Sequence, residues 1–212
     1  GNVVIPSEID GKKVMALGGK IFFCNEFVTS VELPETIVEI PTYAFYKCTN
    51  LEKVVIPEGV KFIGMHAFEE CTSLTAVQIP DSVVTIGDFA FSACTYLESV
   101  NLPQVVTIGE CAFNEWKKGT KLTSLNLPNA TTIGDWAFAY SSLLTSVNLP
   151  KVTSIGMLAF GYCDLRTLNL PEVTTIDGEA FLNNYNLVSC SAPKATTIDY
   201  YPWGNCSRLE TL

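Results

Sequence analysis

Eight cysteines are the first candidates for chemistry in this chain of 212 residues. Five of them, Cys48, Cys71, Cys94, Cys163 and Cys206, stand three residues after an aromatic residue in a recurring segment. The chain has no C-x-x-C pair and a single histidine, so support for a zinc site is very weak. We expect buried, unbridged thiols that pack as small apolar side chains. Disulfides between neighbouring segments are the alternative, because stacked segments can bring Cα atoms to within about 4.4–6.8 Å.

His66 and the adjacent carboxylates Glu69 and Glu70 are the candidates for acid–base chemistry. A general base needs an activated nucleophile or a carboxylate at matched geometry, and nothing in the sequence supplies one. We therefore expect His66 to be a half-exposed member of an aromatic stripe. The sequence also lacks a phosphate-binding glycine loop, a nucleophile elbow and a dinucleotide-binding motif. We expect no enzyme, no catalytic residue, no cofactor and no bound metal.

Three kinds of residue recur together along the chain and define about nine repeats of 21–25 residues. The prolines are Pro34, Pro57, Pro80, Pro103, Pro128, Pro150, Pro171 and Pro193. The aromatic residues are Phe22, Phe45, Phe68, Phe91, Phe113, Phe138, Phe160, Phe181 and Trp203. The isoleucines are Ile40, Ile63, Ile86, Ile108, Ile133, Ile155, Ile176 and Ile198. The consensus unit is L-x-x-V-x-L-P-x-x-V-x-x-I-G-x-x-A-F-x-x-C-x-x.

Each repeat predicts a short strand followed by a turn. Segments such as Val100-Asn101-Leu102 alternate apolar and polar residues, which is typical of a strand with one face buried and one solvated. Proline then ends the strand because it cannot donate to the ladder. The I-G-x-x-A-F segment suits a tight turn in which phenylalanine fills the core. Stacked repeats would form a parallel sheet and a rod about 40 Å long.

The L-x-x-L-x-L frame, together with I-G-x-x-A-F-x-x-C, resembles the BspA-like leucine-rich repeat. This family is found mostly in bacterial surface proteins and in some protozoan ones. The resemblance implies one right-handed leucine-rich-repeat solenoid over residues 1–212. It places a parallel β-sheet on the concave face and turns or short 3-10 or helical segments on the convex face. The family's better-known members are adhesins that bind host matrix proteins, so the resemblance implies a cell-surface or extracellular recognition role.

Charge and hydropathy exclude several classes of partner. Thirteen Lys and Arg face 22 Asp and Glu, which gives a net charge of −9. This balance argues against a nucleic-acid partner, because phosphate binding needs clustered cations. No apolar run reaches the roughly 20 residues of a membrane span, so we expect no membrane insertion. Neither end shows a polar capping repeat, and we expect the chain to be a segment of a longer protein.

Polar residues on the open face of the predicted sheet are candidate ligand-binding residues. The middle column of this face includes Gln78, Asn101, Asn126, Asn148 and Asn169. One interpretation is an asparagine ladder, in which stacked amides bond to one another along the solenoid. The other is a flat polar platform that binds a protein or glycan ligand through many weak hydrogen bonds. The two interpretations are compatible.

An insertion provides the other candidate site. The interval from phenylalanine to the next leucine is normally six residues but is nine from Phe113 to Leu122. It carries Trp116, Lys117 and Lys118, and an amphipathic tryptophan beside cations is typical of a binding hot spot. Trp116 stands in the column that normally holds Cys or Asn. We therefore favour a Trp116 that turns inward while the lysines solvate a long loop.

These observations predict a non-enzymatic recognition or adhesion scaffold for a protein or glycan ligand. Two alternatives are a structural spacer that presents another module and an accessory repeat domain of a larger surface enzyme.

Overall fold

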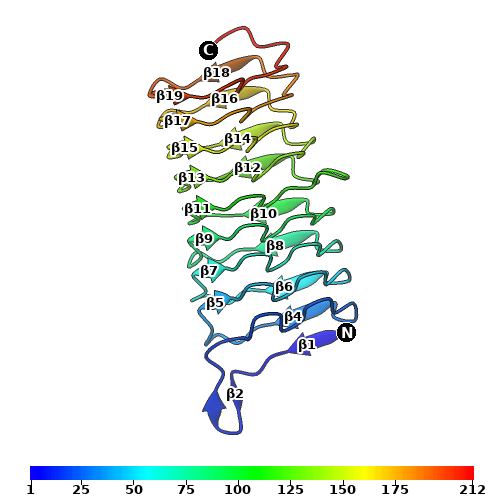
Figure 1. Cartoon of the computed structure of the whole chain (residues 1–212). Helices are drawn as coiled ribbons and strands as arrows, with labels where there is room; N and C mark the ends of the chain where they lie inside the picture. The colour runs from blue at the N-terminus through cyan, green and yellow to red at the C-terminus, as the bar shows by residue number, and fades with distance from the viewer.

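The computed structural model describes all 212 residues and shows an elongated stack of coils (Figure 1). Most coils contain one strand of three residues and one strand of two residues, and turns connect them. The three-residue strands are β1 (Asn2–Val4), β4 (Ser30–Glu32), β6 (Lys53–Val55), β8 (Ala76–Gln78), β10 (Ser99–Asn101), β12 (Ser124–Asn126), β14 (Ser146–Asn148), β16 (Thr167–Asn169) and β18 (Ser189–Ser191). The predicted strand–turn solenoid is confirmed.

We call the sheet built from the three-residue strands the first sheet. Its strands pair in parallel and in register, so that Leu125 of β12 lies beside Val147 of β14. The ladder divides into a three-stranded piece, β1-β4-β6, and three pairs, β8-β10, β12-β14 and β16-β18. One of these breaks lies between β10 and β12, where the chain carries the insertion after Phe113.

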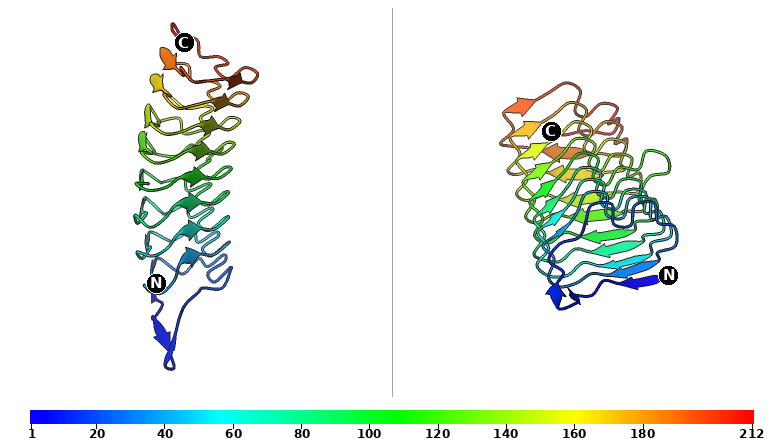
Figure 2. Two further views of the ribbon diagram at one scale, coloured as in Figure 1. Left: turned by 90° about the vertical axis from the view of Figure 1, so that its left-hand side faces the viewer. Right: turned by 60° about the horizontal axis from the view of Figure 1, so that its bottom comes forward.

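A second parallel sheet runs along the solenoid beside the first. It has eight strands of two residues each. They are β5 (Glu39–Ile40), β7 (Phe62–Ile63), β9 (Thr85–Ile86), β11 (Thr107–Ile108), β13 (Thr132–Ile133), β15 (Ser154–Ile155), β17 (Thr175–Ile176) and β19 (Thr197–Ile198). We expected a turn to begin at this isoleucine, but the isoleucine instead ends a strand. The views in Figure 2 show the two rows of strands on different sides of the coil.

The core is a single hydrophobic cluster of 55 residues that extends from Leu17 to Cys206. Through its centre runs a stack of phenylalanine rings from eight successive coils, with the partly buried Phe22 at its N-terminal end: Phe22, Phe45, Phe68, Phe91, Phe113, Phe138, Phe160 and Phe181. Ring centroids lie between 5.0 Å (Phe45 to Phe68) and 5.9 Å (Phe160 to Phe181) apart. Each ring contacts only the coils on either side. The core is therefore continuous along the rod, although every contact in it joins neighbouring coils.

Turns, not helices, return the chain from the second sheet to the first. The glycine that follows the isoleucine is needed because successive coils approach closely there. A Cβ at Gly134 would lie 2.7 Å from the carbonyl carbon of Gly109. The turns also contain non-glycine residues with left-handed backbone, such as His66 (φ 56°) and Glu70 (φ 58°).

A hairpin projects from the N-terminal end of the solenoid (Figure 1). Strands β2 (Glu8–Ile9) and β3 (Lys12–Lys13) pair antiparallel. The turn between them has positive φ at Asp10 and Gly11, as a two-residue hairpin turn of type I′ requires. The structure contains no helix of the length and hydrophobicity that a membrane span requires.

Candidate functional site

The cysteines that follow the core phenylalanine hold neighbouring coils together. The thiols of Cys71 and Cys94 donate to the backbone oxygens of Phe45 and Phe68 in the preceding coil, at 3.1 and 3.2 Å. Asn184 takes the same place in its coil and donates to the oxygen of Phe160 at 2.8 Å. All eight cysteines are unbridged, and six of them are buried, so the expectation of buried, unbridged thiols is confirmed for those six. Cys24 is exposed and Cys111 is half-buried.

Burial controls the ionisation of these thiols. It raises the pKa of Cys48 and of Cys190 to about 11 and that of Cys111 to about 12. The nearby carboxylates of Glu110, Asp135 and Asp88 raise the pKa of Cys111 further. Because the thiolate is the reactive form, these groups are neutral and inert at neutral pH.

We expect a thiol reagent to modify Cys24 alone when the native protein is treated briefly at pH 8. A pKa of about 11 leaves only about one thousandth of the Cys48 thiol ionised at that pH, and Cys111 is ionised still less. Raising the pH toward 11 should make Cys111 reactive, because the group becomes charged only as the pH approaches its raised pKa. Intact-mass spectrometry after alkylation counts the adducts, and a sample in urea should take up eight. Two or more rapid adducts on the native protein at pH 8 would contradict this assignment.

His66 is fixed within an aromatic stack on the turn side of the solenoid. Its ring stacks on Tyr43 at 4.5 Å and on Phe89 at 4.9 Å between centroids. Its Nδ1 pairs with the carboxylate of Glu69. The predicted aromatic stripe is confirmed at this position, and both faces of the imidazole ring are covered by other rings.

The polar row of the first sheet consists of Gln78, Asn101, Asn126, Asn148 and Asn169, the last residues of β8, β10, β12, β14 and β16. All five side chains are exposed. The amide of Asn148 donates to the side-chain oxygen of Asn126 at 2.8 Å, which is one step of the predicted asparagine ladder. An amide has two donors and one oxygen with two lone pairs, so most of the row's hydrogen-bonding capacity faces solvent.

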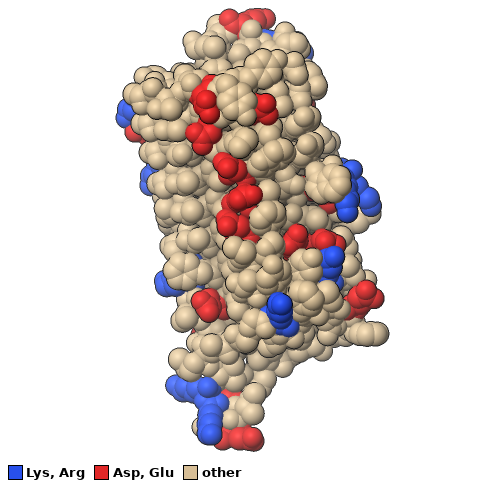
Figure 3. Space-filling model, in the orientation of Figure 1, with Lys and Arg blue, Asp and Glu red and all other residues tan.

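Acidic side chains gather in a stripe that runs along the solenoid on the side shown in Figure 3. Asp88 and Asp135 each accept a hydrogen bond from a backbone N–H of the next coil, at 2.9 and 2.8 Å. Burial raises the pKa of Asp177, and the neighbouring Asp135 and Asp199 raise it further. No group of three His, Cys, Asp or Glu side chains is arranged to hold a metal ion.

The inserted loop corrects the expectation for Trp116. Its side chain is 67% exposed, so it does not turn inward, and Glu115 is the buried residue at 2% exposure. The Glu115 carboxylate accepts hydrogen bonds from the Thr95 hydroxyl at 2.7 Å and from the backbone N–H of Lys117 at 2.9 Å and of Lys118 at 3.3 Å. These donors need a buried acceptor, and an indole offers none. Glu115 therefore takes the inward place and Trp116 is displaced outward.

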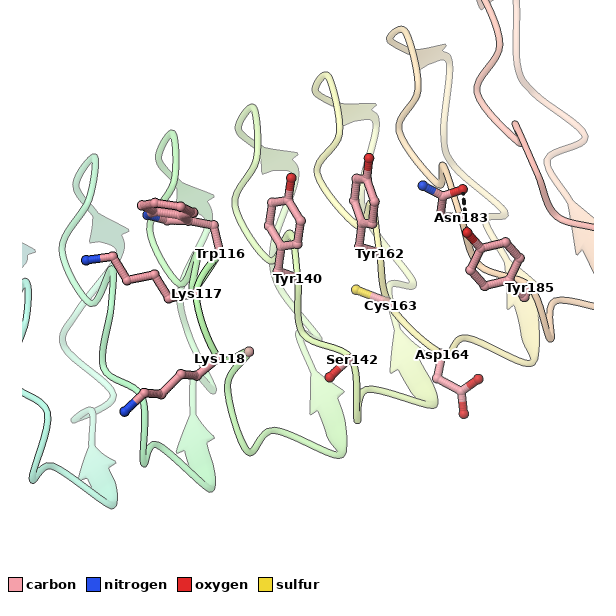
Figure 4. Close-up of a pocket in the computed structure, with 11 residues that line it drawn as sticks. Trp116, Lys117, Lys118, Tyr140, Ser142, Tyr162, Cys163, Asp164, Asn183 and Tyr185 are labelled. Atoms are coloured by element: carbon pink, nitrogen blue, oxygen red, sulfur yellow. Dashed lines mark hydrogen bonds between the residues drawn. The ribbon is translucent and has the colours of Figure 1, made fainter.

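Trp116 forms one end of a groove of about 430 Å³ on the turn side (Figure 4). Tyr140 and Tyr162 follow along the groove, with their rings stacked 4.5 Å apart. Asn183 and Tyr185 form the other end, where the tyrosine hydroxyl donates to the amide oxygen at 3.1 Å. Burial and the adjacent Tyr162 raise the pKa of Tyr140. Sequence reasoning missed these tyrosines, although both occupy one column, two residues after the core phenylalanine.

The structure brings Trp116, Lys117 and Lys118 together in the groove lining. None of the five residues of the polar row lines that groove. The predicted site residues thus divide between two separate surfaces, one on the first sheet and one on the turns.

Comparisons with known proteins identify the repeat. The model of the BspA type leucine rich repeat region matches residues 17–143 and 114–212. No curated protein matches the chain.

Solved bacterial structures share the fold. A T. pallidum leucine-rich repeat protein is 26% identical, with 99% of this chain and 78% of that chain covered and a TM-score of 0.57. A leucine-rich repeat protein from Bacteroides ovatus is 20% identical, with coverages of 100% and 74% and a TM-score of 0.66. One from Eubacterium ventriosum is 22% identical, with coverages of 87% and 54% and a TM-score of 0.60. Because the family's repeat model accounts for nearly the whole length of the solenoid, the chain belongs to the BspA-type leucine-rich-repeat family.

Proposed function

We propose that this protein is a non-enzymatic recognition or adhesion scaffold at the cell surface or outside the cell. In this proposal the polar row of the first sheet binds a protein or glycan ligand. The family and fold support a recognition role by analogy, since extended solenoid surfaces are commonly used for binding. The net charge of −9 weighs against a nucleic-acid partner.

The observation that carries the proposal is the row itself. Asn126 and Asn148 pair in register on neighbouring strands, and the side chains at both ends of these strands are uncharged and exposed. A ligand can therefore bind across several coils without having to desolvate a charge. Each contact would be weak, and affinity would come from the number of coils engaged.

Most of the possible acid–base and nucleophilic groups are engaged in packing, the exposed Cys24 being an exception, which supports a role without catalysis. Five of the six buried thiols donate to backbone oxygens of neighbouring coils, as Cys71 does to Phe45. The imidazole of His66 is stacked on both faces and paired with Glu69. None of these arrangements places an activated nucleophile beside a base.

The double variant Asn126→Arg/Asn148→Arg should weaken binding to an immobilised array of extracellular-matrix proteins and glycans by about tenfold or more. Two long cations would cover the amides and change the charge of the surface. The matched control is Thr132→Arg/Ser154→Arg, which adds the same charges to the same two coils, on the paired strands β13 and β15 of the second sheet. Surface plasmon resonance measures both. Equal binding by the two double variants would remove the polar row as the binding surface.

A structural spacer is the alternative, and the continuous phenylalanine stack favours it because such a core resists bending between coils. A spacer predicts that attachment of cells displaying the protein does not change in the Asn126→Arg/Asn148→Arg variant. An accessory domain of a larger surface enzyme instead predicts a non-repeat catalytic domain in the full-length protein.

A further inference from the structure

The inserted loop is held in one conformation by contacts that expose its tryptophan. The buried Glu115 carboxylate binds two backbone N–H groups of the loop, and the N–H of Gly119 donates to the Glu115 backbone oxygen at 2.9 Å. Gly119 has φ 73°, and a Cβ there would lie 2.8 Å from the oxygen of Tyr140. The loop therefore does not need to be ordered when a ligand arrives, which lowers the entropy cost of binding.

The cations of this loop are free to bind a ligand. Lys117 Nζ lies 5.3 Å from the centroid of the Trp116 ring, and neither Lys117 nor Lys118 has a carboxylate within ion-pair distance. Three other cations are ion-paired: Lys47 with Glu70, Arg166 with Asp164, and Lys194 with Glu172. Glu69 and Glu70 lie near these lysines but are paired with His66 and Lys47. The two adjacent lysines can therefore attract an anion, in a way that salt can screen.

The rest of the groove is polar and aromatic without a free negative charge. Asp164, the one carboxylate in its lining, is paired with Arg166 at 3.1 Å and accepts from the Asn186 amide at 2.6 Å. Figure 4 shows Trp116, Tyr140 and Tyr162 following one another along the groove, with Ser142 and Asp164 beside this row. Aromatic rings with polar tips, next to hydroxyl and amide groups, suit a ligand that has apolar faces and hydroxyl edges.

We propose that this groove binds an acidic glycan, that is, a chain of sugar rings bearing carboxylate or sulfate groups. The C–H face of a sugar ring packs on the exposed Trp116 indole, and its hydroxyls bond to the tyrosine, serine and asparagine groups. The anionic substituent lies between Lys117 and Lys118. An acidic peptide would satisfy the lysines, but its flexible backbone has no flat C–H face for Trp116. The proposal rests on the proposed recognition function and adds a second binding surface, with its own ligand class, that shares no residue with the polar row.

The test measures binding of labelled octasaccharides of heparin, hyaluronan and neutral dextran, and of a polyglutamate peptide, to the folded chain. We expect heparin or hyaluronan to bind, identifying sulfate or carboxylate as the preferred anion, and dextran and polyglutamate to bind much more weakly. Trp116→Ala should reduce affinity about tenfold or more. Lys117→Gln/Lys118→Gln should reduce both the affinity and its salt dependence. The matched control is Lys12→Gln/Lys13→Gln, an adjacent exposed lysine pair in the N-terminal hairpin.

Four results would overturn the proposal. The first is that neither anionic saccharide binds, and the second is that polyglutamate binds as well as they do. The third is that the Lys12/Lys13 control loses as much affinity as the Lys117/Lys118 variant, since that would indicate unspecific charge attraction. Loss of saccharide binding in Asn126→Ala/Asn148→Ala with retention in Trp116→Ala would place the ligand on the polar row instead. Such a result would reject the groove and support the proposed sheet site, so the two proposals can fail separately. Melting temperatures close to that of the unmodified chain confirm that the surface variants are folded.

Discussion

Phe113→Ala should lower the free energy of unfolding by about 3–5 kcal/mol, the range for removing a buried phenylalanine. Phe113 is fully buried and stacks at 5.2 Å on Phe91 on one side and on Phe138 on the other. The variant therefore loses packing at two coil interfaces and leaves a cavity between them.

Because coils contact only their neighbours, we also expect this variant to separate the unfolding of the two halves of the rod. All three tryptophans, Trp116, Trp136 and Trp203, lie on the C-terminal side of Phe113. Tryptophan fluorescence therefore reports on the C-terminal half, whereas circular dichroism reports on the whole chain. The urea unfolding transitions followed by tryptophan fluorescence and by circular dichroism should coincide for the unmodified protein and differ for Phe113→Ala.

Phe27→Ala is the matched control for Phe113→Ala, because Phe27 is 85% exposed and should change stability by less than about 0.5 kcal/mol. A loss below about 1 kcal/mol in Phe113→Ala, with coincident transitions, would contradict the view that the ring stack carries the coupling between coils.

The sequence alone was sufficient to predict the solenoid and its core, because three residue types recur in register over most of the chain. The phenylalanines and the inward cysteines could be placed for the same reason. The second sheet was not predicted because each of its strands, such as Thr132–Ile133, has only two residues. Two residues are too short to show an alternating pattern, and these strands form only because stacking brings them into register.

The left-handed turn positions were also invisible in the sequence. Glycine or asparagine is the usual signal for positive φ, but His66 and Trp136 have φ of 56° and 58°. The stacked coils impose this backbone through hydrogen bonds between turns, for example from the N–H of His66 to the oxygen of Asp88 at 2.9 Å. The tyrosine groove was missed for a related reason, since the direction of Tyr140 and Tyr162 depends on the same turn geometry.

The inserted loop shows why column matching fails where the repeat changes length. Counting from Phe113 put Trp116 in the inward column, whereas the structure places Glu115 there. Three additional residues add backbone N–H groups that the standard turn does not have to satisfy. Unpaired buried donors are costly, so the nearest carboxylate turns inward to accept from them.

Glu115→Ala should therefore destabilise the chain by about 1–3 kcal/mol, because it leaves the Thr95 hydroxyl and the N–H groups of Lys117 and Lys118 without their acceptor. Hydrogen exchange at these two amides should accelerate by about tenfold or more, as a measure of local opening. Glu115→Gln keeps one acceptor oxygen, so its stability and its exchange rates should lie between those of the unmodified chain and those of Glu115→Ala. Exchange measured by mass spectrometry on peptides spanning residues 114–122 resolves the effect. Glu110→Ala is the control, since Glu110 is an exposed carboxylate in the same coil.

The Glu115→Ala variant also tests whether the order of the inserted loop contributes to ligand binding. Glu115 touches no part of the groove lining other than the loop it holds, so any loss of glycan affinity in Glu115→Ala must come from a disordered Trp116 and its lysines. We expect that loss to be smaller than in Trp116→Ala, because the indole is still present but must be ordered on binding. Unchanged exchange at Lys117 and Lys118 together with unchanged affinity would show that the loop keeps its conformation without the carboxylate. Rapid exchange with full affinity would show that the groove binds without a preformed loop.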